Sequence, residues 1–424
     1  MKILFISLGC DKNLADSEEM LGLLTGSGHE IVDSEEEAEA IVINTCCFIH
    51  DAKEESVNTI LEMAEYKKTG KCKALVVTGC MAQRYKEEIT QEIPEVDAVL
   101  GTTSYGDIVK ALNEVQAGHV FQEFRDINEL PEDSGRRVLT TGGHFGYLKI
   151  AEGCDKHCTY CIIPSLRGSF RSVPEERLLA QAEYMASQGV KELILVAQET
   201  TVYGTDLYGR KTLHILLKKL CQIRGIRWIR VLYCYPEEIY DELIQVMKEE
   251  KKICNYLDLP IQHASDRILK RMGRRTTRKQ LTDIITKLRR EIPDVLRTSL
   301  ITGFPGETQE DHEELMEFVD EMEFDRLGVF TYSPEEGTPA ETMEGQVPEE
   351  VKEERRDEIM SLQQEISLEK GSERIGQELL VMIEGKVSGE SAYIGRTYAD
   401  APKVDGYLFV QTGELLVTGD FARV

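Results

Sequence analysis

The chain has 424 residues, of which 41% are hydrophobic and 30% charged, which is typical of a globular protein with room for two or three domains. Asp and Glu outnumber Lys and Arg by 76 to 50, giving a net charge of −26. Such an acidic chain is poorly suited to holding nucleic acid by its phosphates, and well suited to attracting a basic protein partner.

No segment approaches the roughly 18 apolar residues of a membrane helix, so we expect no membrane association. The apolar start of the chain is shorter than the core of a signal peptide and fits a strand better. We therefore expect a cytoplasmic protein. In that compartment thiols stay reduced, so clusters of cysteine indicate metal or redox chemistry.

Residues 1–117 alternate short apolar runs with helical patterns, which predicts an α/β domain with a parallel sheet. The expected strands are Lys2–Ser7, Ala40–Asn44, Ala74–Thr78 and Ala98–Leu100. The expected helices are Ala15–Leu24, Ala52–Tyr66, Met81–Ile89 and Gly106–Asn113. The polar segment 118–140 is predicted to be a linker.

Three cysteines, Cys10, Cys46 and Cys80, each lie just past a predicted strand of this domain. Because the carboxyl ends of parallel strands lie along one edge of a sheet, these thiols should converge. Three thiolates leave one position of an iron–sulfur cubane open, since such a cluster takes four ligands. The alternatives are three buried structural thiols, a zinc site, or a redox disulfide. Cys47, next to Cys46, is expected to point elsewhere. Cys72, Cys221, Cys234 and Cys254 lack convergent spacing and receive no role.

Residues 141–340 contain a second α/β series, which predicts a partial (β/α)6 barrel with its chemistry at the carboxyl ends of the strands. The expected strands are Tyr147–Ala151, Glu192–Val196, Trp228–Leu232, Tyr256–Leu259, Arg297–Ile301 and Leu327–Tyr332, with helices such as Glu175–Ser187 and Gln309–Met322 between them. The strand ends carry Glu152, Gln198, Tyr233, Gln262, His263 and Gly303.

The most informative motif follows the first of these strands: Cys154, Cys158 and Cys161 in a C-x3-C-x2-C spacing. Three thiols within eight residues can wrap one soft-metal centre and again leave a fourth position open. A zinc site that borrows His157 is the main alternative, although zinc sites favour paired C-x2-C units separated by a longer loop. The spacing resembles the signature of the radical S-adenosylmethionine (SAM) enzymes.

The last part of the chain changes character twice. Residues 341–370 are predicted to be a linker helix, which we expect to be a solvated connector because of its charge run at Glu349–Lys370. Residues 371–424 contain short apolar runs separated by glycine turns, which predicts a small antiparallel β-barrel of OB-like character. Its expected strands are Glu378–Glu384, Ser391–Arg396, Tyr407–Val410 and Glu414–Val417.

Taken together, these features resemble the methylthiotransferases, a family of radical SAM enzymes, over almost the whole chain. In that family the small C-terminal barrel is a TRAM domain. Three stretches, Ser7–Met20, Asn44–Ser56 and Gly395–Gly406, resemble the branch that modifies a protein and not tRNA. The sequence departs from the family pattern at Glu199, where the family has Asp after Gln. Because Glu keeps the carboxylate, the change affects the position of this group more than its chemistry.

The resemblance implies two 4Fe–4S clusters and SAM as cofactors. The cluster on Cys154, Cys158 and Cys161 would cleave SAM reductively to a radical that removes hydrogen from the substrate. The cluster on Cys10, Cys46 and Cys80 would supply the sulfur that is methylated and inserted. SAM contacts are expected from Gln198, Arg230 and Gly303, each of which could equally be an ordinary barrel residue, and His263 is either a ligand group or a structural histidine.

The implied substrate is a basic ribosomal protein, protein twelve of the small subunit, modified at the β-carbon of an aspartate either free or on the ribosome. An electron donor such as flavodoxin is a further implied partner. The nearest alternative is a tRNA adenosine methylthiotransferase, which the acidic C-terminal barrel disfavours. A non-catalytic iron–sulfur or zinc scaffold is the alternative of another class. The basic run at Lys270, Arg271, Arg274, Arg275 and Arg278 does not discriminate between them.

Overall fold

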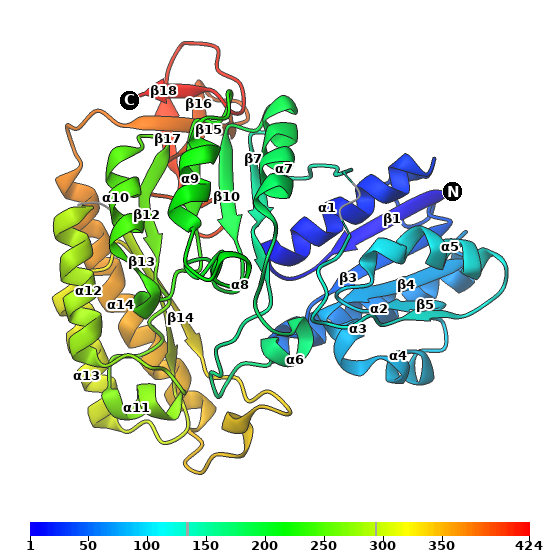
Figure 1. The fold of residues 1–424 in the computed structure, drawn as a ribbon, viewed down its shortest axis with the longest axis horizontal. Coiled ribbons are helices and arrows are strands. Elements are labelled where there is room, and N and C mark those ends of the chain that lie inside the picture. Colours follow the sequence, from blue (N-terminus) through cyan, green and yellow to red (C-terminus); the bar gives the residue numbers. More distant parts are fainter. Residues whose placement is uncertain (133–134, 293–294) are drawn as a thin grey trace. The chain divides into compact units, whose positions relative to one another are not determined.

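The computed structural model describes residues 1–132, 135–292 and 295–424 (Figure 1). The predicted linker therefore includes two residues, 133 and 134, that lie outside the described part. The chain divides into two compact units. The first contains residues 1–140, 151–173 and 333–341, and the second contains residues 141–150, 174–332 and 342–424.

The first unit is built on a six-stranded sheet in the order β2-β1-β3-β4-β5-β6, in which every neighbouring pair is parallel. Its strands are β1 (Lys2–Ser7), β2 (Glu30–Val32), β3 (Ala40–Thr45), β4 (Ala74–Gly79), β5 (Ala98–Leu100) and β6 (Phe121–Glu123). Its helices are α1 (Asp11–Gly26), α2 (His50–Thr69), α3 (Cys80–Tyr85), α4 (Glu87–Glu92) and α5 (Ile108–Gln116). The predicted parallel α/β domain is confirmed.

Both faces of this sheet are covered, as a parallel sheet requires. One face carries Leu4, Ile41 and Ile43 and packs against α2, α3 and α4. The opposite face carries Ile3, Ala40 and Val42 and packs against α1 and α5. Because side chains alternate along a strand, the near-continuous apolar runs of β1, β3 and β4 supply both cores at once.

Two features of this unit differ from the sequence prediction. The single helix expected at Met81–Ile89 is two short helices, because Lys86 between them has φ of 43°, a left-handed conformation that ends α3. The segment predicted to be a linker supplies β6, which pairs with β5. Short three-residue strands such as β6 carry too little periodic signal to be recognised in a polar stretch.

The first unit also includes the segment that carries the C-x3-C-x2-C motif. This segment forms the two-stranded antiparallel pair β8 (Ala151–Glu152) and β9 (Arg171–Ser172), with the short helix α6 (Ile163–Arg167) between them. All six cysteines singled out by the sequence therefore belong to one unit.

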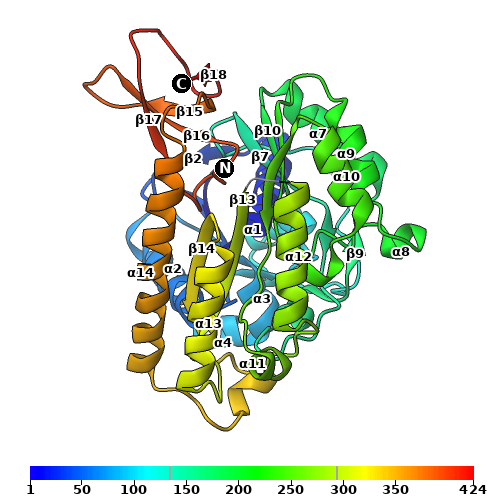
Figure 2. The same cartoon turned by 90° about the vertical axis from the view of Figure 1, so that its left-hand side faces the viewer.

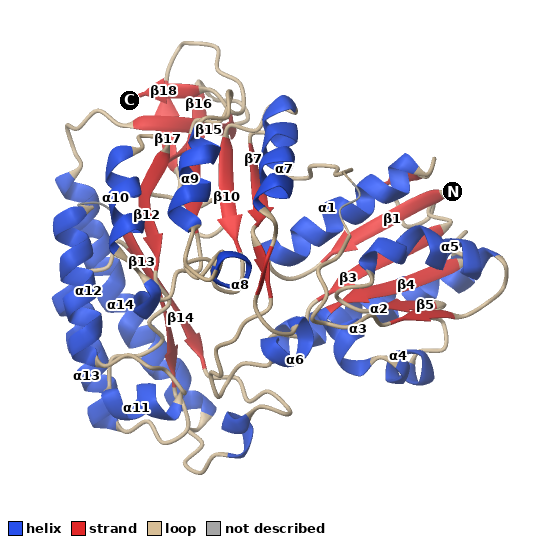
Figure 3. Cartoon of the chain, viewed as in Figure 1, coloured by secondary structure: helices blue, strands red, loops and turns tan. Residues whose placement is uncertain are grey.

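The second unit is built on a six-stranded parallel sheet in the order β14-β13-β12-β11-β10-β7, which confirms the predicted partial barrel (Figure 3). Its strands are β7 (Phe145–Lys149), β10 (Glu192–Val196), β11 (Trp228–Val231), β12 (Ile253–Asp258), β13 (Val295–Thr302) and β14 (Arg326–Thr331). The helices between them are α7 (Glu175–Ser187), α8 (Thr205–Tyr208), α9 (Leu213–Cys221), α10 (Asp241–Glu249), α11 (Asp266–Arg271), α12 (Arg278–Glu291) and α13 (Gln309–Met322).

The charged helix α14 (Glu349–Glu373) is not a solvated connector, so that prediction is wrong. It packs along β14 and α13, and Figure 2 shows it beside both. Lys352 and Arg355 are buried on its inner face: Lys352 Nζ donates to the Tyr332 carbonyl at 2.8 Å, and Arg355 Nη1 donates to Glu307 at 2.9 Å. The charged sequence did not indicate this buried face. Lysine and arginine can bury the aliphatic part of the side chain while the charged group pairs with a partner.

The C-terminal part of the unit is a four-stranded antiparallel sheet in the order β17-β16-β15-β18, which confirms the predicted small β-domain. Its strands are β15 (Leu380–Lys386), β16 (Ala392–Thr397), β17 (Leu408–Gln411) and β18 (Phe421–Arg423). The strand predicted at Glu414–Val417 is wrong. Leu415 is 92% exposed there, and β18 takes the place beside β15.

Buried charges join this small sheet to the amino-terminal ends of the large one. Glu192, the first residue of β10, pairs with Arg230 of β11 at 2.8 Å and with Arg396 of β16. All three side chains are fully buried. Arg396 also binds Glu384 at 2.6 Å, and Glu384 binds His144, which precedes β7, at 2.7 Å. The C-terminal domain is therefore held at the end of the sheet opposite to the carboxyl ends of its strands.

Neither unit has, within the described ranges, a helix long and apolar enough to cross a lipid bilayer.

We predict that Glu192→Gln destabilises the protein by about 3–5 kcal/mol, because it leaves two buried arginines without their shared counter-charge. Urea unfolding of the metal-free chain measures the effect. The matched control is Glu378→Gln, which breaks the exposed pair with Arg423 and should change stability by no more than about 0.5 kcal/mol. Equal stability of the two variants would contradict the structural role of the ion cluster.

Candidate functional site

The cysteines that follow β1, β3 and β4 lie at one edge of the first sheet, as predicted. Cys10 is the residue before α1, Cys46 comes directly after β3, and Cys80 is the first residue of α3 after β4. The register pairs Ser7 with Asn44 and Thr45 with Gly79, so the three strands end level with one another. Cys46 and Cys80 are buried and Cys10 is exposed.

Close packing between the loops brings these thiols within electrostatic range. Gly9 has φ of 85°, and a Cβ on it would lie 2.9 Å from Cys46 Sγ, so only glycine fits before Cys10. Burial raises the pKa of the Cys46 thiol to about 12, and the nearby Cys80 and Cys10 thiols add repulsion in the same direction. A metal centre that supplied positive charge would favour the thiolate form of ligands held this close together.

A polar face of α1 holds the loops in place. Asn13 is fully buried, and its Nδ2 donates to the carbonyl of Leu8 at 3.1 Å and to that of Thr45 at 2.9 Å. One side chain therefore ties the end of β1 to the end of β3. The Cys46 backbone is fixed separately by Ser56, whose hydroxyl accepts from its N–H at 3.1 Å and donates to its carbonyl at 2.8 Å.

The Cys154, Cys158 and Cys161 loop is compact as well. The Cys154 N–H donates to the Gly168 carbonyl at 3.1 Å, and the Cys161 N–H donates to the Cys158 carbonyl at 3.1 Å. Burial raises the pKa of the Cys161 thiol to about 12, with repulsion from Cys158 and Cys154 added. His157, the borrowed ligand of the zinc alternative, is exposed.

Both sets of three thiols fit an iron–sulfur cubane by their donor chemistry, because thiolates are its usual ligands. Within the described ranges, no three His, Cys, Asp or Glu side chains gather in the geometry that holds a single metal ion. In a cubane each thiolate binds a different iron atom, so its ligands stand further apart than those around one zinc ion. Each set of three thiols offers the kind of donor that a cluster uses. Their assignment as ligands stays a prediction.

The predicted SAM residues lie in the second unit, and Gln198 is the one whose surroundings favour a ligand. Gln198 follows β10 by two residues and is half-buried. Its Oε1 atom is buried and has no hydrogen-bond partner among the described residues. A buried amide oxygen without a partner is costly, and a bound ligand would satisfy it.

Arg230 and Gly303 have protein partners instead. Arg230 binds Glu192, and its Nη1 also donates to the Tyr398 carbonyl at 2.7 Å. The space beside Gly303 is filled by Lys352 of α14, 2.1 Å from where a Cβ would be. These contacts give both residues a structural role, and a SAM contact by either stays a prediction without support from this geometry.

The carboxyl ends of β11 and β12 carry backbone strain. Tyr233 has φ of 58° and Gln262 has φ of 71°, conformations that non-glycine residues rarely adopt and that cluster at functional sites. His263, next to Gln262, is fully buried, and its Nδ1 accepts from the N–H groups of Ala264 and Ser265 at 3.0 Å each. Its Nε2 is buried, has no hydrogen-bond partner among the described residues and lies 3.6 Å from Glu307, so Nδ1 has a structural role while Nε2 is available to a ligand.

The basic run at 270–278 is largely used within the fold. Arg271 Nε donates to the Pro305 carbonyl at 2.8 Å, and Arg274 Nη2 donates to the Pro260 carbonyl at 2.9 Å. Arg278 pairs with three glutamates of α13, at 3.0 Å from Glu317 and from Glu321. These contacts give the run a structural explanation that needs no phosphate ligand.

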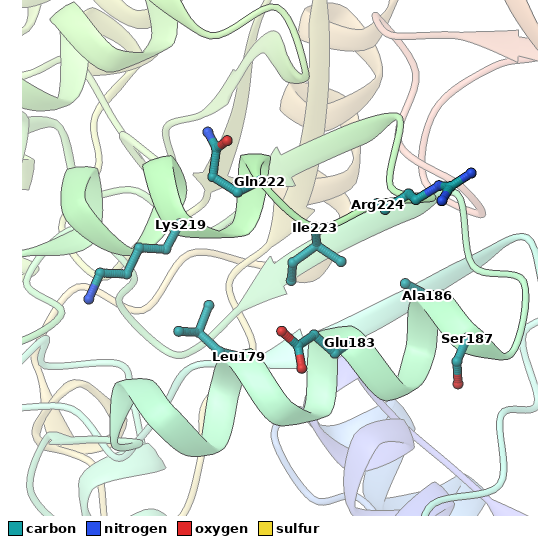
Figure 4. A pocket seen from close by; sticks show the side chains of 8 residues that line it. All are labelled: Leu179, Glu183, Ala186, Ser187, Lys219, Gln222, Ile223 and Arg224. Atoms are coloured by element: carbon teal, nitrogen blue, oxygen red, sulfur yellow. The ribbon is translucent and has the colours of Figure 1, made fainter.

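A surface pocket of about 550 Å³ lies between α7 and the end of α9 (Figure 4). Figure 4 shows Leu179 and Glu183 of α7 on one side of the pocket, and Lys219 and Ile223 on the other. The pocket is on the outer helical layer, and none of the predicted site residues is part of its lining. We assign it no role.

Several residues that organise the cysteine edge were not predicted from the sequence: Asn13, Asp16, Ser56 and Arg167. Asn13 and Asp16 are spaced by three along α1 and share one helical face, which is a detectable signal for a buried polar stripe. Arg167 lies six residues after Cys161 and donates hydrogen bonds to Asp16 and Asn13 of α1, a contact that nothing in the local sequence indicates.

Comparisons with known proteins cover the whole chain. Residues 2–101 match a model described as uncharacterized protein family UPF0004, residues 148–319 match the radical SAM superfamily, and residues 375–424 match the TRAM domain. A ribosomal protein uS12 methylthiotransferase RimO from Lachnoclostridium phytofermentans is 63% identical, over 100% of this chain and 97% of its own. Proteins of the same name from Pelotomaculum thermopropionicum and Clostridioides difficile are 51% and 48% identical, over all of this chain and 96% of theirs.

Solved structures give the fold only. The radical SAM methyltransferase TsrM from Kitasatospora setae aligns with a TM-score of 0.57 and 13% identity, over 80% of this chain and 75% of that one. The cobalamin-dependent SAM radical enzyme OxsB aligns with a TM-score of 0.53 and 13% identity, over 87% of this chain and 56% of that one. At such identities only the arrangement of strands and helices is shared.

We predict that Asn13→Ala lowers the free energy of unfolding of the metal-free chain by about 2–4 kcal/mol, because each buried polar group left without a partner costs about 1–3 kcal/mol. It should also reduce the iron bound after anaerobic reconstitution. The matched control is Asn113→Ala on α5, where the side chain is exposed. Iron content and stability equal to those of the control would contradict the proposed bridging by Asn13.

Proposed function

Since the chain belongs to the family of ribosomal protein uS12 methylthiotransferases within the radical SAM superfamily, we propose that it adds a methylthio group to the β-carbon of an aspartate in ribosomal protein uS12. The chain is an enzyme of the radical SAM methylthiotransferase type, as the sequence predicted. Full-length identity of 63% to a relative of that name supports the same substrate.

Membership of the radical SAM superfamily implies a 4Fe–4S cluster and SAM. We assign that cluster to Cys154, Cys158 and Cys161, and we propose a second one on Cys10, Cys46 and Cys80. What supports the second cluster is the level ending of β1, β3 and β4, which brings three thiols to one edge of the sheet. When bound, the clusters and SAM would supply the radical that breaks the C–H bond of the substrate and the sulfur that is inserted there.

The contribution of the chain is to hold and orient the groups that bind the clusters and SAM. Asn13 and Ser56 fix the backbone of the loops that carry Cys10 and Cys46. The unpartnered Oε1 of Gln198 offers an acceptor at the carboxyl end of β10. Fixing these groups before the reaction lowers the entropic part of the activation barrier.

The tRNA alternative requires a basic C-terminal domain, since phosphate neutralisation dominates nucleic-acid binding. Residues 371–424 hold five basic side chains against eight carboxylates. One of the five, Arg396, is fully buried between Glu192 and Glu384, where no phosphate can reach it. These observations favour a basic protein over an RNA as the substrate.

We further propose a cytoplasmic location, contact with uS12 either free or within the ribosome, and a reducing partner such as flavodoxin. The support is the family and the reductive chemistry that it implies.

Replacing Cys154, Cys158 and Cys161 together by Ala should halve the bound iron and abolish formation of 5′-deoxyadenosine. Replacing Cys10, Cys46 and Cys80 by Ala should also halve the iron, leave SAM cleavage intact and stop methylthio insertion into uS12. Iron and sulfide counted per chain after anaerobic reconstitution, with mass spectrometry of uS12, measure both effects.

The matched control is Cys221→Ala on α9, a buried cysteine outside both groups, which should retain all iron and activity. Methylthio insertion by the chain without Cys10, Cys46 and Cys80 would disprove their role. Modification of tRNA in place of uS12 would favour the alternative substrate.

A separate prediction follows from the net charge of −26. The association rate with uS12 should fall by on the order of tenfold between low and high salt, because electrostatic steering of a basic partner is screened. Stopped-flow association at several ionic strengths measures it. A rate that does not depend on salt would count against charge-guided recognition.

A further inference from the structure

Arg167 occupies an unusual position for a charged side chain. It ends α6, six residues after Cys161, and only 3% of its side chain is exposed. Its Nη1 donates to Asp16 Oδ2 at 2.8 Å, and its Nη2 donates to Asn13 Oδ1 at 2.6 Å. Nη1 also lies 3.5 Å from both carboxylate oxygens of Glu152. The guanidinium therefore links the loop that carries one set of cysteines to the helix that follows Cys10.

The same guanidinium lies beside the other set of cysteines. Asn13 Oδ1, which accepts from Arg167, is 3.9 Å from Cys80 Sγ. Burial raises the pKa of both the Cys80 and the Cys46 thiol, and the nearby positive charge of Arg167 opposes this rise. Asp16 acts on Cys80 in the opposite direction.

A fixed charge this close to a cluster ligand affects the affinity of the cluster for an electron. Reduction adds negative charge to a cluster, and a buried cation nearby stabilises the reduced form, because charge is weakly screened away from water. A buried carboxylate has the opposite effect. Arginine keeps its charge at every pH at which the protein is folded, so the effect is permanent.

We propose that Arg167 is a positioning residue that ties the two cysteine loops together and raises the reduction potential of the cluster bound by Cys10, Cys46 and Cys80. This inference rests on the proposed function, since it requires that second cluster. It also predicts opposite signs for two neighbouring side chains: Arg167 raises the potential and Asp16 lowers it. A residue that merely stabilised the fold would not produce this pair of signs.

The test uses the full chain with Cys154, Cys158 and Cys161 replaced by Ala, which leaves one cluster to observe. After anaerobic reconstitution, a redox titration followed by electron paramagnetic resonance gives its midpoint potential. On this background Arg167→Gln should lower the equilibrium constant for reduction by about tenfold, equivalent to about 59 mV for one electron. Asp16→Asn should raise it, and Arg167→Lys should restore most of the potential lost in Arg167→Gln.

The matched control is Arg171→Gln, which removes a positive charge from the same segment. Arg171 is bound to the Arg167 and Ser169 carbonyls and not to α1, so its loss should leave the potential nearly unchanged. If Arg167→Gln does not fold, Arg167→Met replaces it as the neutral variant, and its potential should lie below that of Arg167→Lys on the same background.

A fully occupied cluster whose potential is the same in Arg167→Gln, or shifts in the same direction in both variants, would overturn the inference and leave the proposed function intact. A background chain that binds no cluster would refute the second cluster itself, and the inference with it.

Discussion

Parallel pairing of β1, β3 and β4 is the constraint on which the cysteine edge depends. Three residues far apart in sequence come together only because these strands run in one direction and end level. Each thiol follows its strand by no more than three residues, so a change of register would move a thiol away from the others. The apolar cores on both faces of the sheet hold that register.

The edge is also where the protein buries polar groups and pairs them with one another. Asn13, Asp16 and Arg167 form a connected set whose hydrogen bonds reach both cysteine loops. A connected buried network specifies one arrangement of its members, because any partner moved away leaves an unsatisfied group behind. The separate network around Glu192 and Arg396 does the same for the C-terminal domain.

Much of this architecture is predictable from the sequence, because its signals are local. Apolar runs predicted most of the parallel strands, and the cysteine spacings predicted the candidate ligands. Contacts between distant segments were not predictable: nothing near Arg167 indicates that it meets α1, and the charges of α14 concealed its buried face. The structure also explains stretches that carried the resemblance. Ser56 fixes the backbone of Cys46, and Arg396 and Asp400 attach the C-terminal sheet, Asp400 by its pair with Arg326 at 2.5 Å.

The seam between the large and small sheets of the second unit contains buried ion pairs beside an aromatic contact, in which the rings of Trp228 and Phe421 lie 4.8 Å apart. If an apolar interface opened, it would expose hydrophobic surface, which promotes aggregation. When a seam of paired charges such as Glu192 and Arg396 opens, each surface becomes an ordinary hydrated one, and water takes over the role of the missing partner. Separation of the small sheet would therefore let water replace Arg396 beside Glu192, and its main apolar cost would be the ring of Trp228, which loses its contact with Phe421.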